Sequence, residues 1–207
     1  MGMSDPTNPA KGKPLRAWQR MLSGRRLDLL NPSALDVEFE DIAHGLARVA
    51  RWNGQTNGRH AFSVAQHSLL VEQVCRHLLS KPTSADCLYA LLHDAPEYVI
   101  GDMISPFKAV VGGAYKEIED RLAGAIHLRA GLEAQVRDKL KRTIKQADRN
   151  VAYFEAVTLA GFDPDEAHKF FGRPKGLNAE MLDLNPWDTS TAQGKFLERL
   201  HELDPNL

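Results

Sequence analysis

Apolar residues recur along most of the chain at steps of three and four positions, the spacing of one helix face. This spacing predicts a helix from about residue 84 and others over residues 36–52, 63–79, 115–130, 133–159 and 191–203. A short helix is expected to open at Asp163-Pro164-Asp165. No run alternates with period two and no internal repeat is found, which favours an all-α fold with six or more helices.

The segments between these helices carry the residues that usually begin or end a helix. Ser63 is expected to cap the helix that follows it, Pro82-Thr83-Ser84 to cap the next, and Gly161 to end the helix before it. Residues 15–22 fit either a short helix or a strand. Residues 27–35 are expected to form an irregular strap, and residues 172–189 a loop.

The composition fits one globular domain that follows a flexible N-terminal arm. Residues 1–14 are rich in Pro, Gly and Lys and are expected to stay mobile, so the predicted domain covers residues 15–207. The chain is 43% hydrophobic and its formal net charge is −1, which argues against a nucleic-acid polymer or a membrane surface as partner. Cys75 and Cys87 are too few for a disulfide framework. With no signal peptide and no apolar run of about 18 residues, a cytoplasmic location is predicted.

Two ionisable residues interrupt apolar rows of predicted helices. His67 shares a row with Val71 and Val74, and Asp148 lies between Ile144 and Val151 on another. A single such histidine is often a core residue whose hydrogen bonds are satisfied. Burying the charged Asp148 carboxylate without a partner would cost on the order of several kcal/mol. We therefore expect a partner for it from elsewhere in the fold.

The segment from Leu91 to Lys108 concentrates further ionisable side chains: His93, Asp94, Glu97 and Asp102. Adjacent helical residues diverge by about 100°, so His93 and Asp94 can reach one ion only near a helix end, which Pro96 supplies. Taken together, His67, His93, Asp94 and Asp148 predict a site for one divalent transition metal (Mn, Fe, Co, Ni or Zn, with Mg possible). His127 is the one further histidine between His93 and Asp148, and a single additional imidazole favours one ion over two.

An upstream His, a His-Asp pair and a distal Asp, in this order, resemble the signature of the HD-domain metal-dependent phosphohydrolases. Within them, HDAPEYVIGDMISPFK is similar to the corresponding segment of the bacterial 5′-deoxynucleotidases. The resemblance covers about residues 47–160. It implies an HD-type helical bundle that releases phosphate from (deoxy)nucleoside 5′-monophosphates, and such relatives tend to form homodimers.

The resemblance also implies roles for single residues. Glu97 would orient or deprotonate the attacking water and Asp102 would protonate the departing oxygen, although these roles could be exchanged and both side chains could instead belong to a solvated helix end. The phosphate and the sugar or base would be bound by Arg51, Trp52, Ser105 and Lys108. A core position is an equally good interpretation of Trp52. Ser105 and Ile104 depart from the usual pattern of the group, which leaves the sugar preference open.

Two other functions fit the same residues. One is hydrolysis of another nucleotide or small phosphate ester, such as a hyperphosphorylated guanine nucleotide. The other is a non-catalytic HD sensor that binds metal and nucleotide, against which the intact Glu97 and Asp102 argue.

Overall fold

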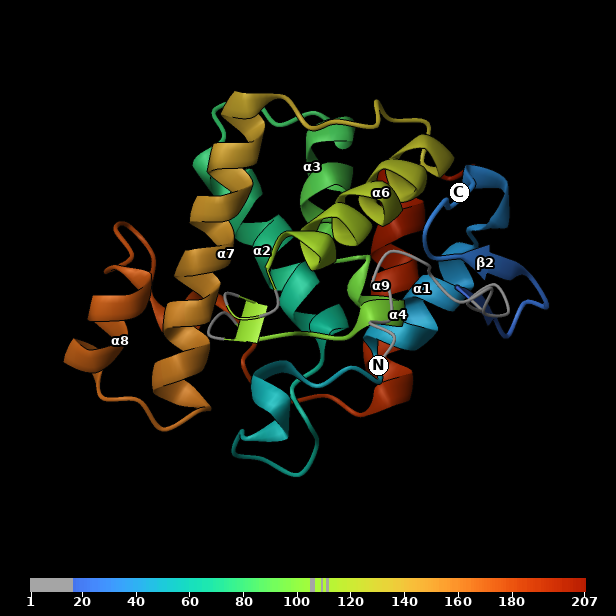
Figure 1. The fold of residues 1–207 in the computed structure, drawn as a ribbon. Coiled ribbons are helices and arrows are strands. Elements are labelled where there is room, and N and C mark those ends of the chain that lie inside the picture. Colours follow the sequence, from blue (N-terminus) through green and yellow to red (C-terminus); the bar gives the residue numbers. More distant parts are fainter. Residues whose placement is uncertain (1–16, 105–106, 109, 111) are drawn as a thin grey trace, which may run out of the picture.

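The computed structural model describes residues 17–104, 107–108, 110 and 112–207, and they form a helical bundle (Figure 1). Its described α-helices are α1 (Phe39–Leu46), α2 (Val64–Leu78), α3 (Ser84–Leu91), α4 (Glu97–Ile100), α6 (Gly113–Arg129), α7 (Asp138–Thr158), α8 (Pro164–Phe171) and α9 (Thr189–Leu203). Shorter 3-10 turns are η1 (Ala34–Asp36), η2 (Arg51–Gly54) and η3 (Ala179–Met181). The prediction of an all-α bundle with six or more helices is confirmed. The predicted N-terminal arm lies outside the described residues.

A small hairpin precedes the bundle. Strand β1 (Trp18–Arg20) pairs antiparallel with β2 (Arg26–Asp28), so that Trp18 lies opposite Asp28. The strand alternative for residues 15–22 therefore fits, whereas the strap predicted for residues 27–35 begins as part of β2 and ends in η1. Three-residue strands are too short for period-two alternation to be visible in the sequence.

The helix predicted over residues 36–52 is wrong as one continuous element. α1 ends at Leu46, and Ala50 then forms an antiparallel bridge with Ser63. The Arg51 amide donates to the Phe62 carbonyl at 2.8 Å, so this stretch pairs with a distant segment instead of continuing the helix. A tertiary pairing of this kind leaves no local signal.

The predicted caps of α2 and α3 are confirmed. The Ser63 hydroxyl accepts a hydrogen bond from the Gln66 amide at 3.2 Å. Thr83 and Asp86 form a reciprocal capping box, in which each side chain accepts from the backbone amide of the other. These caps begin α2 and α3 at well-defined residues, and α2 and α3 pack against each other.

The helix predicted from residue 133 begins later, at Asp138. The Glu133 carbonyl accepts a hydrogen bond from the Tyr89 hydroxyl, and the Ala134 carbonyl accepts one from the His127 ring. These tertiary contacts occupy carbonyls that a helix would use internally. Asp163 caps α8 as predicted, and α9 covers the range expected for the last helix with two extra residues at its start.

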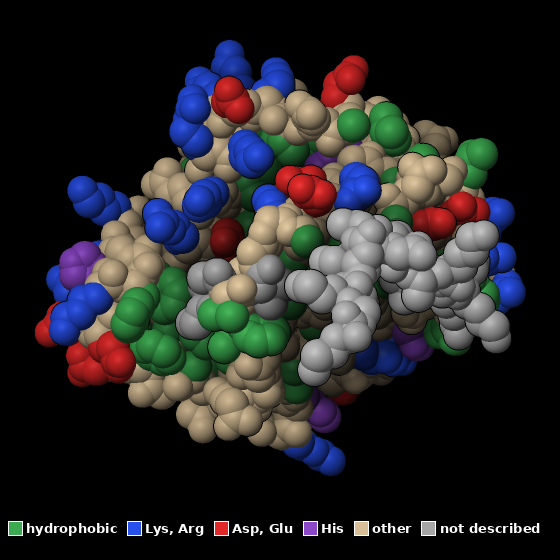
Figure 2. Space-filling model, in the orientation of Figure 1, with side chains coloured by type: hydrophobic (Ala, Val, Ile, Leu, Met, Phe, Trp, Pro, Cys, Tyr) green, Lys and Arg blue, Asp and Glu red, His purple; other side chains and the backbone are tan. Residues whose placement is uncertain are grey.

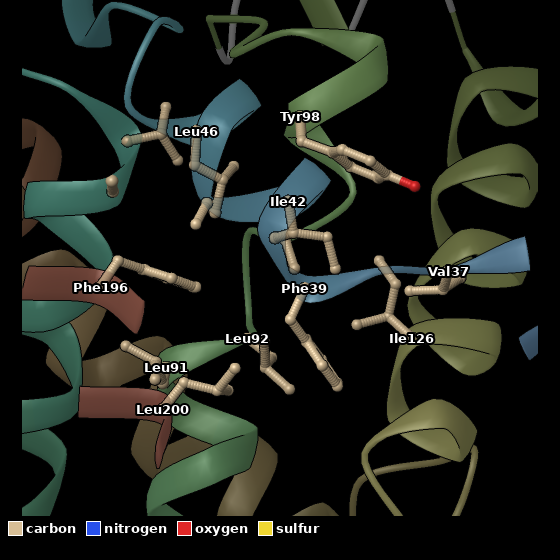
Figure 3. Packing of buried hydrophobic residues seen from close by; sticks show 14 of the residues in the cluster. Val37, Phe39, Ile42, Leu46, Leu91, Leu92, Tyr98, Ile126, Phe196 and Leu200 are labelled. Carbon is tan, nitrogen blue, oxygen red and sulfur yellow. The ribbon is translucent and has the colours of Figure 1, made fainter. Parts of the chain in front are cut away.

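Two apolar cores lie on either side of α3. Figure 3 shows the first, in which Ile42 of α1, Ile126 of α6 and Phe196 of α9 are almost completely buried together with Leu91 and Leu92. The second lies between α2 and α7, which are adjacent in Figure 1. The α2–α7 contact is the one that brings His67 and Asp148 together.

Lys and Arg side chains gather over α7 on the face shown in Figure 2, as expected for the solvated side of this helix. In the part of the chain that the structure describes, no helix is both long and apolar enough to cross a bilayer.

Candidate metal centre and active site

Three separate elements supply the candidate metal ligands. His67 lies in the first half of α2, Asp148 lies in the middle of α7, and His93 and Asp94 follow the end of α3. The chain between Leu91 and Glu97 is a turn, so the His-Asp pair occupies a helix end, as the diverging directions of neighbouring side chains require. The buried contact between α2 and α7 positions the other two residues.

The structure brings these side chains into one cluster. One ligand atom each from His67, His93 and Asp148 lie within 4.8 Å of one another. Asp94 adjoins this group, with its Oδ2 3.2 Å from His93 Nε2 and 3.5 Å from His67 Nε2. Asp148 Oδ1 lies 3.3 Å from His67 Nε2. All four predicted ligands are thus close together, although only the ligand atoms of His67, His93 and Asp148 all lie within 4.8 Å of one another.

Both imidazoles present the same nitrogen to the cluster. His93 Nδ1 lies 2.9 Å from the Ala90 carbonyl, which can only accept, so Nδ1 carries a proton and the neutral ring has its lone pair on Nε2. His67 Nδ1 lies 2.6 Å from the Glu155 carboxylate, with the same consequence. Among the described residues, both Nε2 atoms are buried without a hydrogen-bond partner. Two such lone pairs beside carboxylates fit a divalent metal ion.

The electrostatics of the cluster also favour a cation. Burial alone would raise the pKa of Asp94 and of Asp148, but His93 beside Asp94 and His67 beside Asp148 lower both values. Burial and Arg51 lower the pKa of His67, yet Glu155 and Asp148 outweigh them and raise it to about 10, so without a metal ion the ring also holds a proton on Nε2. The carboxylates therefore favour a positive charge here, and a divalent ion bound by the two Nε2 atoms would supply it in place of the His67 proton.

Glu97, at the start of α4, lies beside this cluster and is 2% exposed. Its Oε1 is 3.5 Å from Lys108 Nζ, and its Oε2 is buried without a partner among the described residues. Burial, with Asp94 and Asp102 nearby, raises the pKa of Glu97 to about 9 against the opposing effect of Arg51 and Lys108. The solvated helix end considered for Glu97 does not fit this burial.

Asp102 is also not a solvated side chain. Arg51 Nη1 donates to its Oδ2 at 2.9 Å, and the two side chains are 13% and 6% exposed. The Nε of Arg51 is buried without a hydrogen-bond partner in the described part of the chain, and its nearest carboxylate oxygen, Glu155 Oε2, is 3.5 Å away. Arg51 is thus held at the site with hydrogen-bonding capacity to spare.

Trp52 adopts an unusual backbone conformation next to Arg51. Trp52 and Asn53 have φ values of 57° and 51°, the left-handed region that bulky residues rarely occupy. The Trp52 ring packs at centroid distances of 5.7 and 5.8 Å from Phe162 and Phe171. Such strain often marks a functional site, where surrounding contacts maintain it. Ser105 lies outside the described residues.

Two comparisons with known proteins include this region. The family described as 5′-deoxynucleotidase YfbR-like matches residues 38–162. The chain belongs to this family. The protein is therefore an HD-domain phosphohydrolase. Its family implies a divalent metal ion and a small-molecule nucleotide substrate. An uncharacterized protein of Rhodobacter capsulatus is 52% identical over 188 residues, which cover 91% of this chain and 96% of that protein.

The family region contains one functional candidate that the sequence reasoning missed. Glu155 is completely buried and contacts His67, Arg51 and Trp52. Burial would raise the pKa of Glu155, but His67 and Arg51 lower it to about 2, so it is ionised. Its position seven residues after Asp148 on α7 was the available signal, because that spacing repeats the same helix face. His127 lies outside the cluster and contacts the Ala134 carbonyl and the Tyr89 ring.

Proposed function

We propose that this protein is a metal-dependent phosphomonoesterase that releases phosphate from nucleoside 5′-monophosphates, with deoxynucleotides as preferred substrates. The observation that carries the proposal is the convergence of two unpartnered imidazole nitrogens and two carboxylates beside a buried Glu97. His67, His93, Asp94 and Asp148 would bind one divalent ion. When bound, that ion would polarise a phosphoryl oxygen and lower the pKa of its water.

The acid and base steps are assigned to the two carboxyl groups outside the cluster. Glu97 orients or deprotonates the attacking water, and Lys108, 3.5 Å away, favours the ionised carboxylate that this role needs, against the burial that raises the Glu97 pKa. Asp102 delivers a proton to the departing 5′-oxygen. The ion pair with Arg51 at 2.9 Å orients the Asp102 carboxylate, which takes up a proton from the attacking water or from solvent before it gives one to the departing oxygen. The two roles could also be exchanged, with Glu97 as the acid and Asp102 as the base.

Substrate binding is assigned to cationic and aromatic side chains at the rim of the cluster. Arg51 has an unpartnered Nε, and a guanidinium suits a phosphate dianion because it donates in a planar fork. Trp52, whose ring packs against Phe162 and Phe171, would contact the sugar or base. Ser105 would complete the phosphate pocket.

The assay uses protein stripped with chelator and reloaded separately with Mn²⁺, Co²⁺, Zn²⁺ or Mg²⁺. Phosphate release is measured on paired ribo- and deoxynucleoside monophosphates, a hyperphosphorylated guanine nucleotide and an unrelated phosphate ester. Release from the monophosphates is expected. If the protein binds metal but releases phosphate from none of these compounds, the result would support a non-catalytic HD sensor and contradict the proposed phosphomonoesterase.

Two variants test the metal-binding role and the catalytic role separately. Asp148→Asn is expected to lose metal, whereas Glu97→Gln is expected to retain metal and lose about 10²- to 10⁴-fold in kcat, the usual contribution of a general acid or base. His67→Ala is likewise expected to lose metal, and His77→Ala is its matched control, because His77 is exposed on the same helix. Full activity of Glu97→Gln would show that its catalytic assignment is wrong.

A further inference from the structure

Glu155 of α7 gives each of its two carboxylate oxygens a different partner. Oε1 lies 2.6 Å from His67 Nδ1, on the side of the metal ligands. Oε2 lies 2.9 Å from Trp52 Nε1 and 3.5 Å from Arg51 Nε, on the side of the substrate residues. The side chain is 0% exposed, so water cannot replace either set of contacts.

The direction of both hydrogen bonds follows from the groups involved. An ionised carboxylate only accepts, and an indole nitrogen only donates. Trp52 therefore donates to Oε2, and His67 Nδ1 donates to Oε1. In the neutral ring that binds a metal, the proton on Nδ1 leaves the Nε2 lone pair of His67 facing His93 and Asp148.

Trp52 needs such an anchor more than an ordinary surface residue would. A left-handed conformation at two consecutive non-glycine residues costs on the order of 1–3 kcal/mol each and persists only where other contacts determine it. Phe162 and Phe171 pack on the ring, but apolar packing does not fix its rotation as a hydrogen bond to Nε1 does.

We propose that Glu155 is a positioning residue that couples the metal centre to the substrate pocket. One oxygen sets the tautomer and orientation of His67, and the other sets the position of Trp52 and Arg51. This inference rests on the proposed metal and substrate roles of His67 and Trp52. If Glu155 couples the two sides, the loss of metal affinity caused by substituting Glu155 should depend on whether Trp52 is present, although Trp52 itself binds no metal.

The substitution Glu155→Gln tests the coupling because it preserves shape and leaves only one acceptor oxygen. If the amide oxygen faces Trp52, the amide NH₂ faces His67 and favours the tautomer whose Nε2 carries a proton and cannot bind metal. If the oxygen faces His67, the NH₂ confronts the Trp52 N–H and displaces the ring. Either His67 or Trp52 must therefore lose its partner.

Two measurements distinguish a loss at His67 from a loss at Trp52. Metal affinity is measured by titrating Mn²⁺ or Co²⁺ into the chelator-treated protein against a competing indicator. The position of Trp52 is followed by its fluorescence and acrylamide quenching in a Trp18→Phe/Trp187→Phe background, which leaves Trp52 as the one remaining Trp of three. Glu155→Gln is expected to weaken metal binding about 10- to 100-fold, the usual effect of losing such an outer partner, or else to increase quenching of Trp52.

The double variant decides whether the two sides are coupled. In Trp52→Phe the competing donor is absent, so the amide oxygen that Glu155→Gln introduces is free to face His67. Any loss of metal affinity in Glu155→Gln is therefore expected to be smaller, by about threefold or more, when Trp52→Phe is also present. Trp52→Phe alone should leave metal affinity within about twofold of the wild type.

Glu72→Gln is the matched control. Glu72 is 2% exposed and pairs with Arg199 at 2.8 Å, so it is a buried, ion-paired Glu outside the cluster. Its substitution should leave metal affinity and Trp52 quenching unchanged. Should Glu155→Gln not fold, Glu155→Asp retains the charge but is too short to reach both partners, and one readout must still change.

Three results overturn the coupling: wild-type values for both readouts in Glu155→Gln, wild-type values for both in Glu155→Asp, or a metal defect that Trp52→Phe does not relieve. Each leaves the proposed function intact. A wild-type protein that binds no divalent metal would instead overturn the proposed function itself.

Discussion

Gly45 of α1 lies where α1 meets α4, and replacing it with Ala should disturb both stability and the site. A Cβ at this position would lie 2.8 Å from Tyr98 Cβ, 2.9 Å from the Tyr98 carbonyl oxygen and 3.1 Å from Tyr98 Cα. Ordinary contacts between carbon atoms are about 3.5–4.0 Å. Two of these three atoms belong to the backbone and the third is bonded to it, so α4 must move by roughly 0.7–1 Å.

The expected free energy has two opposing parts. Overpacking of this kind costs about 1–3 kcal/mol, and Gly→Ala inside a helix stabilises by about 1 kcal/mol. Gly194→Ala in α9 is the control, because nothing lies within 4 Å of a Cβ built there and only the stabilising part applies. The free energy of unfolding of Gly45→Ala should thus be about 1–3 kcal/mol below that of Gly194→Ala, measured by urea unfolding.

The same displacement should reach the proposed chemistry, since α4 begins at Glu97 and follows the turn that carries Asp94. A misplacement of about 1 Å can lower a rate by about 10²-fold. We expect kcat to fall in Gly45→Ala and to stay near the wild-type value in Gly194→Ala. Equal gains in stability for the two variants would refute the packing argument, whatever happened to the rate.

Two further predictions concern a cap and a buried carboxyl group. Thr83→Ala removes the hydroxyl half of the capping box of α3 and should lower the free energy of unfolding by about 1 kcal/mol in urea titration, while Ser80→Ala, outside the helix, should have little effect. Burial and neighbouring carboxylates raise the pKa of Glu97 to about 9 from its ordinary 4.5, so the unfolded chain releases this proton at a lower pH than the folded chain does. Stability from this group is complete below pH 4.5 and decreases up to pH 9, so metal-free wild-type protein should lose more stability over that range than Glu97→Gln. Parallel stability curves for the two proteins in chelator would contradict the shift.

Helix periodicity was the strongest signal in the sequence. It located the helices that carry His67 and Asp148, because an apolar row is a local pattern that survives in any tertiary context. The pattern failed between Leu46 and Arg51, where a bridge from Ala50 to Ser63 ends α1 early. It also placed the start of α7 too early, because tertiary hydrogen bonds to Glu133 and Ala134 replace helical ones.

The candidate site divides in the same way. The residue types and order of His67, His93, Asp94 and Asp148 were readable from the chain, and so was the family to which their pattern belongs. Their roles, that of Ser105, the homodimer and the cytoplasmic location stay predictions.

The sequence by itself determined the helical architecture and the set of groups that can bind a metal, since both depend on residue type and short-range spacing. Only the tertiary structure decided which nitrogen each imidazole presents, that Arg51 pairs with Asp102, and that Glu155 joins His67 to Trp52. Those features depend on contacts between residues 51 to 103 positions apart, with the exception of His93, whose partner is three residues away. Their geometry arises from the packing of α2, α7 and the Arg51–Gly54 turn, which no local pattern records.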